Sequence, residues 1–274
     1  MRLTQLGGLI RYEILLQWRQ RLLTGITLSL IALPLVMYVL FGQTNAAEVQ
    51  RTWITSGGIA TEAALNVTTR YVVIYATMAI YVIVLLVLPV VAADVVAKDR
   101  HHGVRELVDG LPLTPGTYLA GKLLGWWGAA AIGLLLSMII VGAGLWVLIG
   151  PYHLDQFAGT WLAFGWGIGL VNSGISLLLA AGQPTRRRAI ITGVVFAALC
   201  LFANISLLGQ SNSLWNFLSP GRHAISIHFM LEAWRDQFAV QFAPTSDVLW
   251  ALLGGVLEVA VVWTIVWAWS KRRA

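Results

Sequence analysis

One run of residues in the chain has the spacing of a phosphate-binding loop. Residues 116–122 have the sequence Gly-Thr-Tyr-Leu-Ala-Gly-Lys, and in G-x-x-x-x-G-K loops backbone amides and the lysine hold nucleotide phosphates. Such a loop also needs Ser or Thr next for magnesium and a strand before it, whereas Leu123 follows here. Thr114-Pro115 instead predicts a helix N-cap followed by proline in the first turn. We therefore expect no ATP hydrolysis by this chain, and we expect Lys122 to lie at lipid headgroups.

The histidines and the single cysteine give no metal, haem or catalytic pattern. His223 and His228 are five residues apart, a poor spacing for metal ligands. Ser173 follows Asn172 in a run that could belong to a hydrolase, but no histidine is expected at the same depth. Cys200 has no second cysteine with which to form an intramolecular disulfide. The sequence therefore predicts no catalytic, cofactor-binding or metal-binding residue.

Composition predicts an all-α integral membrane protein. Hydrophobic residues make up 58% of the 274 and charged residues 11%, against about 45–50% and about 25% in soluble domains. Six apolar stretches are long enough to cross a bilayer, which needs roughly 20 residues. Backbone groups in lipid must bond internally, which favours helices. The predicted spans are residues 22–41, 71–93, 123–149, 158–182, 189–208 and 248–269.

The chain before the first span predicts an amphipathic helix on the membrane surface. Apolar residues recur there at steps of three and four, with arginines beside them. The predicted organisation is thus an interfacial helix over 1–21 and a six-helix transmembrane domain over 22–274. Gly121 and Gly125, like Gly165 and Gly169, have a spacing that lets helices approach closely. Ordinary packing within the bundle explains this spacing better than a dimer contact does.

The basic residues predict the orientation. With the N-terminus inside, fourteen of the 18 Lys and Arg residues fall on the inner side, as the positive-inside rule requires. Residues 98–112, 183–188 and 270–274 are then inside, and 42–70, 150–157 and 209–247 are outside, with Gly57-Gly58 as a break in the first outer loop. We expect the protein in the plasma or inner membrane of the cell, with both termini in the cytoplasm. The net charge of +6 is read as topology, with no nucleic-acid partner.

One acid interrupts the last span. Glu258 lies near the middle of residues 248–269, after Gly254 and Gly255. A charge at the bilayer centre costs about 2.5–3.5 kcal/mol on insertion scales, so we expect Glu258 to face the bundle, a water-filled cavity or a second subunit. Two interpretations remain open, a hydrogen-bonded clamp between helices and a polar point on a translocation path.

The polar stretch 94–122 contains a short amphipathic helix. Its apolar residues recur at i, i+3, i+4 and i+7 and so share one face. The face consists of Val104, Leu107, Val108 and Leu111, and the charged residues beside it are Arg105, Glu106 and Asp109. Gly110 and Pro112 end the helix. A helix of this kind between two spans binds either lipid headgroups or a partner protein.

The layout and this stretch together resemble the membrane subunit of an ABC-2 type ABC transporter. These permeases usually have an interfacial N-terminal helix, six spans and both ends inside. Their first inner loop often has an acid and Arg, then Gly-Thr-x-Glu, Leu, Pro, and Gly-Lys before span three. The corresponding residues here are Asp99-Arg100, Gly103, Glu106, Leu107, Pro112 and Gly121-Lys122. The sequence departs from the pattern at Val104, where Thr is common, and at Asp99, where Glu is common.

The resemblance implies a permease driven by a separate ATPase that holds ATP and magnesium. The loop helix would be a coupling helix in a groove of that ATPase. Its contact residues would be Gly103, Val104, Arg105, Glu106, Leu107, Val108, Asp109, Leu111 and Pro112. The implied partners are ABC ATPase subunits, a second permease of the same or a different kind, and membrane lipids. The apolar composition of 209–247 favours export of an amphipathic or lipid-like substrate.

Other functional classes remain open. A non-transporting membrane anchor or sensor subunit would have the same spans. A membrane-embedded enzyme is disfavoured, because no catalytic set converges at one depth. A loop helix that binds only lipid is also disfavoured, because Asp99, Glu106 and Asp109 would be repelled by anionic headgroups.

Overall fold

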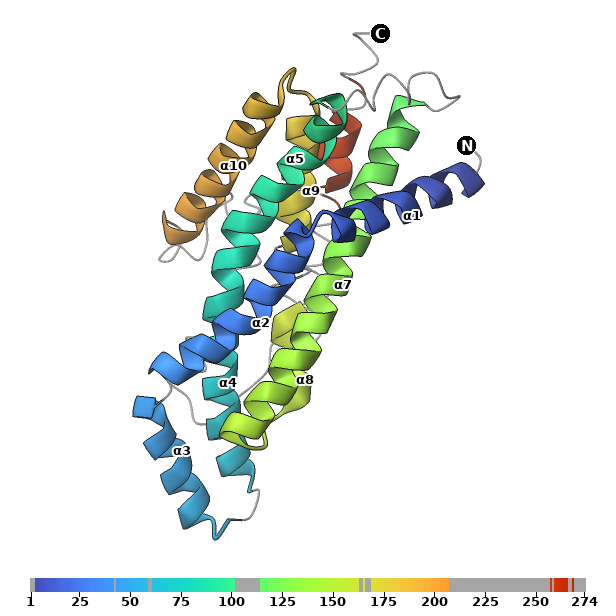
Figure 1. The fold of residues 1–274 in the computed structure, drawn as a ribbon. Helices are drawn as coiled ribbons and strands as arrows, with labels where there is room; N and C mark the ends of the chain where they lie inside the picture. The colour runs from blue at the N-terminus through green and yellow to red at the C-terminus, as the bar shows by residue number, and fades with distance from the viewer. Residues whose placement is uncertain are drawn as a thin grey trace.

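The computed structural model describes residues 3–41, 43–58, 61–101, 114–162, 165, 169–206, 257, 259–265 and 268. All regular secondary structure in this part of the chain is helical, and no strand occurs in it. The all-α class predicted from composition is confirmed for the described residues. Figure 1 shows the helices as an elongated bundle.

Two helices that meet at a bend form the N-terminal part of the protein. α1 (Leu3–Arg19) confirms the helix predicted within 1–21, and α2 (Leu22–Phe41) has the bounds predicted for the first apolar helix. Between them Arg21 has φ +60°, a left-handed conformation that costs a non-glycine residue about 1–2 kcal/mol. Lys98 Nζ donates a 2.8 Å hydrogen bond to Gln20 Oε1, which ties the bend to α5.

The region predicted as a first outer loop, 42–70, is largely helical. α3 (Gln43–Thr55) precedes a turn in which Gly57 and Gly58 have φ +68° and +75°, so the predicted break is confirmed. The sequence did not indicate this helix, which tertiary contacts stabilise. Trp53 Nε1, for example, donates a 3.1 Å hydrogen bond to Thr68 Oγ1.

A continuous helical rod follows the glycine turn. It consists of α4 (Glu62–Val82), the π-helical segment η1 (Ile83–Val87) and α5 (Leu88–His101). The predicted span 71–93 lies inside this rod, whose helical residues extend beyond the span at both ends. At about 1.5 Å per residue, the rod is roughly twice as long as the 30 Å hydrocarbon core of a bilayer. The π-helical turn, a rare feature, lies near its middle.

The second half of the described chain has four further helices. They are α7 (Pro115–Ile149), α8 (Leu154–Leu162), α9 (Val171–Ala181) and α10 (Arg186–Ser206). The predicted N-cap is confirmed, because Thr114 Oγ1 accepts a 3.2 Å hydrogen bond from the Thr117 amide. The turn predicted over 150–157 ends at His153, and the apolar stretch 158–182 contains the end of α8 and all of α9. Of the last predicted span, the described residues are helical.

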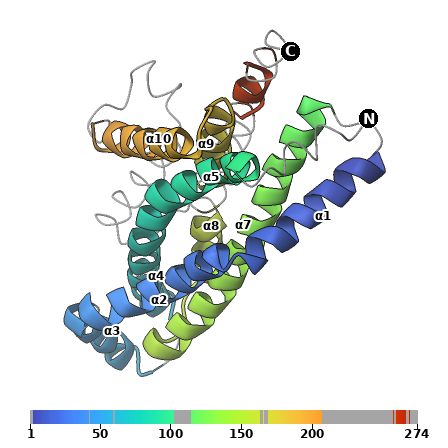
Figure 2. The same ribbon diagram turned by 45° about the horizontal axis from the view of Figure 1, so that its top comes forward.

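Two closely packed groups of helices meet along a seam, and α2 also packs on α4 and η1. α1 and α2 pack against α7, and α9 and α10 pack against α5, as Figures 1 and 2 show from two directions. We name these the α7 group and the α5 group. Helices α5 and α7 touch only briefly. Residues 102–113 connect α5 to α7 along the chain, so this segment joins the two groups.

Glycines on α7 make room for α1. A Cβ atom at Gly125 would lie 2.5 Å from Glu13 Cβ, and one at Gly121 would collide with Leu9. The close approach predicted from the four-residue spacing is confirmed, and it serves packing within the chain. Gly169 likewise allows a close contact with η1, since a Cβ atom there would lie 2.8 Å from Val84 Cγ1.

The two ends of the bundle differ in content. One, named here the 102–113 end, has the end of α5, the start of α7 and the turn between α9 and α10; the other has α3 and the turn after α7 (Figure 1). At the α3 end the His153 amide donates a 2.9 Å hydrogen bond to Thr69 Oγ1. Tyr152 donates one of 2.8 Å to the Gly142 carbonyl, and burial raises the pKa of Tyr152 to about 12.

Within the described residues, two helices are long and apolar enough to cross a membrane. They are Leu22–Leu40 and Gly116–Ile149, and α9 is a shorter apolar helix. These segments lie within α2 and α7, so both belong to the α7 group.

Candidate functional site: charged clusters beside residues 102–113

The residues predicted to contact a partner, Gly103 to Pro112, lie outside the described residues, as does Glu258. The structure does describe both flanks of the 102–113 segment. On each flank a charged side chain pairs with a residue distant in sequence, and these pairs define the candidate site.

A buried cluster of three charged side chains joins α1, α5 and α7. Lys122 Nζ lies 2.5 Å from Glu13 Oε2 and 2.6 Å from Asp99 Oδ2. The side chains of Lys122, Glu13 and Asp99 are 2%, 0% and 8% exposed. In such surroundings the attraction between opposite charges is strong, and so is the penalty for an unpaired charge. We name this set the Lys122 cluster.

Two neutral donors complete the Lys122 cluster. Gln17 Nε2 donates a 2.5 Å hydrogen bond to Glu13 Oε1, and the Tyr118 hydroxyl donates one of 2.6 Å to Asp99 Oδ2. One cation thus faces two carboxylates, and each carboxylate has a further donor. The expectation that Lys122 reaches lipid headgroups was wrong, because its ammonium is enclosed by these partners.

Local sequence places each member of the Lys122 cluster. Glu13 and Gln17 are four residues apart on α1, so they share the face that packs on α7. Gly125 has no side chain to keep Glu13 away from α7. Tyr118 and Lys122 are likewise four apart on α7 and face Asp99, which lies two residues before the end of α5.

A second charged pair joins α5 to α10. Arg186 Nε and Nη2 donate hydrogen bonds of 2.7 and 2.8 Å to the two oxygens of Asp94, a bidentate geometry. These hydrogen bonds and the charge of Asp94 raise the pKa of Arg186 above its usual range. The Arg186 side chain is 39% exposed, so water screens this pair far more than the Lys122 cluster.

Small residues bring α5, α9 and α10 close together beside the Asp94–Arg186 pair. Ala93 and Ala97 of α5 pack with Ala180 and Ala189 in one buried cluster. A Cβ at Gly193 would lie 2.6 Å from that of Ala93. In addition, Ser176 Oγ donates a 2.7 Å hydrogen bond to the Pro89 carbonyl. The α5 group is therefore closely packed just where Asp94 and Arg186 meet.

Two tryptophans make further polar contacts across the seam, in addition to the Lys98–Gln20 hydrogen bond. Trp126 Nε1 donates a 3.1 Å hydrogen bond to Ser173 Oγ, and Trp127 Nε1 donates one of 2.8 Å to the Leu170 carbonyl. Both donors belong to α7, whereas Ser173 lies in α9 and Leu170 directly precedes it. The seam between the groups is thus fastened by the Lys122 cluster and by these indole hydrogen bonds.

The Lys122 cluster has the residue types of an acid–base site without the access that catalysis needs. Its charged groups point at one another, and less than a tenth of each side chain is exposed. No substrate atom could reach them without separating α1 from α7. Within the described chain, no group of three His, Cys, Asp or Glu residues is placed to hold a metal ion. The arrangement is suited to holding helices together.

The pairings of Glu13, Asp94, Lys122 and Arg186 were not foreseen from the sequence. One signal was available for the first. Glu13 is an acid on the same helical face as apolar Ile10 and Ile14 of α1, and an acid on such a face needs a cation opposite it. Nothing in the local sequence of Asp94 indicates Arg186, which follows 92 residues later.

No protein-family model matches the chain, and no curated protein matches its sequence.

Proposed function

We propose that the protein is the permease subunit of an ATP-driven ABC transporter, and that residues 102–113 receive the movement of a separate ATPase subunit. The observation that best supports this proposal is the place of the segment in the chain. It connects the α5 group to the α7 group, and each flank is fastened by charged side chains to further helices.

The mechanism follows from these fastenings. Movement of residues 102–113 pulls on the end of α5 and the start of α7. The Lys122 cluster passes the α7 movement to α1, and the Asp94–Arg186 pair passes the α5 movement to α10. A closely packed group moves as a unit. Closure of two ATPases would therefore rock helix groups of two permeases between two states.

The apolar outer faces of the helices support a membrane location. In the most apolar stretches of α2 and α7, only 28% and 33% are buried, whereas a core helix of a soluble protein is mostly covered. Leu28 is 60% exposed, Ile139 64% and Val147 84%. Large exposed apolar surfaces mark contacts with membranes or with other proteins.

The ends of the bundle support the proposed topology of six spans with both termini in the cytoplasm. The flanks of 102–113 and the turn with Arg186, Arg187 and Arg188 lie together at one end (Figure 1). The α3 segment and the turn at 150–153 lie at the other. Positive charge thus gathers at the 102–113 end, which the positive-inside rule assigns to the cytoplasm.

Copurification tests the proposed function. Affinity purification of the tagged chain from its native membrane, followed by mass spectrometry, should recover an ABC ATPase in near-equal amount. ATP hydrolysis should accompany the complex and be absent from the chain alone. Recovery of a stable complex without any ATPase would reject the proposal in favour of a non-transporting anchor or sensor subunit.

Cysteine labelling tests the topology separately. Arg51→Cys and Arg187→Cys place thiols at exposed positions of the two ends, and the native Cys200 is buried. An impermeant maleimide should label position 51 in intact cells and position 187 only after the cells are opened. The reverse pattern would overturn the orientation.

The proposed substrate is an amphipathic or lipid-like molecule that is exported. This rests on the apolar composition of residues 209–247, among them Trp215, Phe217 and Phe229. Comparing the export of lipid-like and hydrophilic molecules by cells with and without the protein would test the substrate class.

A further inference from the structure

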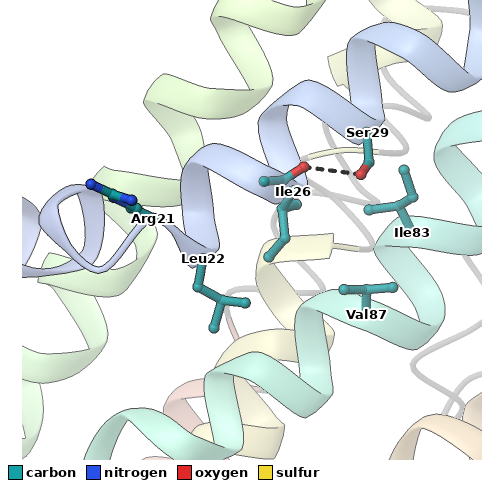
Figure 3. A pocket seen from close by; sticks show the side chains of 7 residues that line it. Arg21, Leu22, Ile26, Ser29, Ile83 and Val87 are labelled. Atoms are coloured by element: carbon teal, nitrogen blue, oxygen red, sulfur yellow. Dashed lines mark hydrogen bonds between the residues drawn. The ribbon is translucent and has the colours of Figure 1, made fainter.

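A groove opens between the first turns of α2 and the π-helical segment η1. It has a volume of about 340 Å³ and is lined by Arg21, Leu22, Gly25, Ile26, Ser29, Ile83 and Val87. Figure 3 shows Leu22 and Ile26 on one wall, with Ile83 and Val87 facing them from the other. The volume falls in the range of about 300–1,000 Å³ typical of small-ligand sites.

The walls of the groove offer apolar contact and little else. Ser29 Oγ already donates a 2.9 Å hydrogen bond to the Gly25 carbonyl, so its hydroxyl proton is engaged within α2. Gly25 leaves the floor open, because a Cβ there would meet nothing within 4 Å. From residue 22 to residue 29 the groove extends for about 10 Å at the rise of an α-helix. An extended hydrocarbon chain fits such a shape.

One end of the groove has an exposed positive charge. Arg21 lies at that end in Figure 3, with its guanidinium directed away from Ile83 and Val87. The side chain is exposed and has no hydrogen-bond or ion-pair partner among the described residues. The acid nearest to Arg21 in the sequence, Glu13, is paired with Lys122. An anion can therefore approach this guanidinium while an attached apolar chain lies along the walls.

We infer that the groove binds a membrane phospholipid with a net negative headgroup, whose charge is attracted by Arg21 and one of whose acyl chains lies between α2 and η1. The inference rests on the membrane location in the proposed function, because Arg21 directly precedes α2 and so lies at the bilayer boundary. It does not depend on the ATPase. A bilayer lipid fits the site because the groove is open on its side, toward the lipid that would surround α2.

Native mass spectrometry of the detergent-released full chain tests the inference. The protein is equilibrated with phosphatidylglycerol or with phosphatidylcholine of the same acyl chains. One phosphatidylglycerol per chain should be retained in preference to phosphatidylcholine. Arg21→Asn should weaken this binding about fivefold, as expected for loss of one basic contact at an anionic surface. Asn suits the site because it tolerates a positive φ better than most residues.

Two groove-filling variants and a matched control make the test specific. Gly25→Leu and Ser29→Leu should each abolish retention of phosphatidylglycerol, because a larger side chain occupies the chain's position. Arg19→Gln removes an exposed arginine that does not line the groove and should change nothing. Equal retention of the two lipids by the native chain, or unchanged retention in Arg21→Asn and both filled variants, would overturn the inference. Neither result bears on whether an ATPase copurifies.

Discussion

Asp94 and Asp99 are five residues apart on α5, and each holds a neighbouring helix in a different way. Asp99 belongs to the Lys122 cluster, in which every charge is buried and each carboxylate has a second donor. Asp94 pairs with one half-exposed arginine. The ion pairs of α5 thus hold it more firmly to α7 and α1 than to α10. In the proposed permease, the Lys122 cluster would transmit movement more rigidly than the Asp94–Arg186 pair, which water screens.

Removing the cation of the Lys122 cluster should have the largest effect. Lys122→Met leaves Glu13 and Asp99 buried without a positive partner, and breaking a buried pair costs about 3–5 kcal/mol. The melting temperature of the detergent-solubilised protein should fall sharply. A triple variant, Lys122→Met with Glu13→Gln and Asp99→Asn, should recover most of the lost melting temperature, because no unpaired charge remains. A single variant as stable as the native protein would contradict the buried cluster.

Closing the space between α1 and α7 should have an intermediate effect. Gly125→Ala would place a Cβ atom 2.5 Å from Glu13 Cβ and 3.3 Å from the Ile10 carbonyl, and overpacking costs about 1–3 kcal/mol. Gly8→Ala is the matched control, because its Cβ would meet nothing within 4 Å. That control should be neutral or stabilising by about 0.5–1 kcal/mol. Equal melting temperatures for both variants would mean that α1 does not pack on α7.

The exposed pair should contribute least. Arg186→Gln should lower stability by less than about 1 kcal/mol, the usual range for exposed ion pairs. The loss should shrink as salt is raised, because salt screens such charges. Arg187→Gln, at an exposed neighbouring position, should leave the melting temperature unchanged. A larger loss for Arg186→Gln than for Lys122→Met would reverse the comparison between the two sides of α5.

Local patterns in the sequence predicted the local features of the fold. α2 has its predicted bounds, Thr114 caps α7, Gly57-Gly58 breaks the chain, and Gly121 and Gly125 admit α1. The first three depend on neighbouring residues alone, and the glycine spacing indicated a close approach without showing which helix makes it. Helix α3 was missed because hydropathy measures polarity, and a polar segment can still be helical when it packs on α4.

The charged clusters could not be predicted in the same way. Glu13 and Lys122 are 109 residues apart, and helical periodicity shows which face a residue is on without showing what lies opposite. The π-helical turn η1 also has no signature in its sequence of five aliphatic residues. The partner contacts of Leu107 and the surroundings of Glu258 lie outside the described residues and stay predictions.

The central claim is that residues 102–113 bind an ATPase, and Leu107→Asp tests it most directly. A charge in an apolar contact should reduce copurification of the ATPase sharply, since an unpaired buried charge costs several kcal/mol. The variant should keep its membrane level and melting temperature, because the Lys122 cluster is untouched. Arg187→Ala, in the other turn at the same end, is the control and should copurify normally. Loss of the ATPase from a stable Leu107→Asp chain is the predicted result, and ATPase recovery at the native level with transport retained would contradict the account.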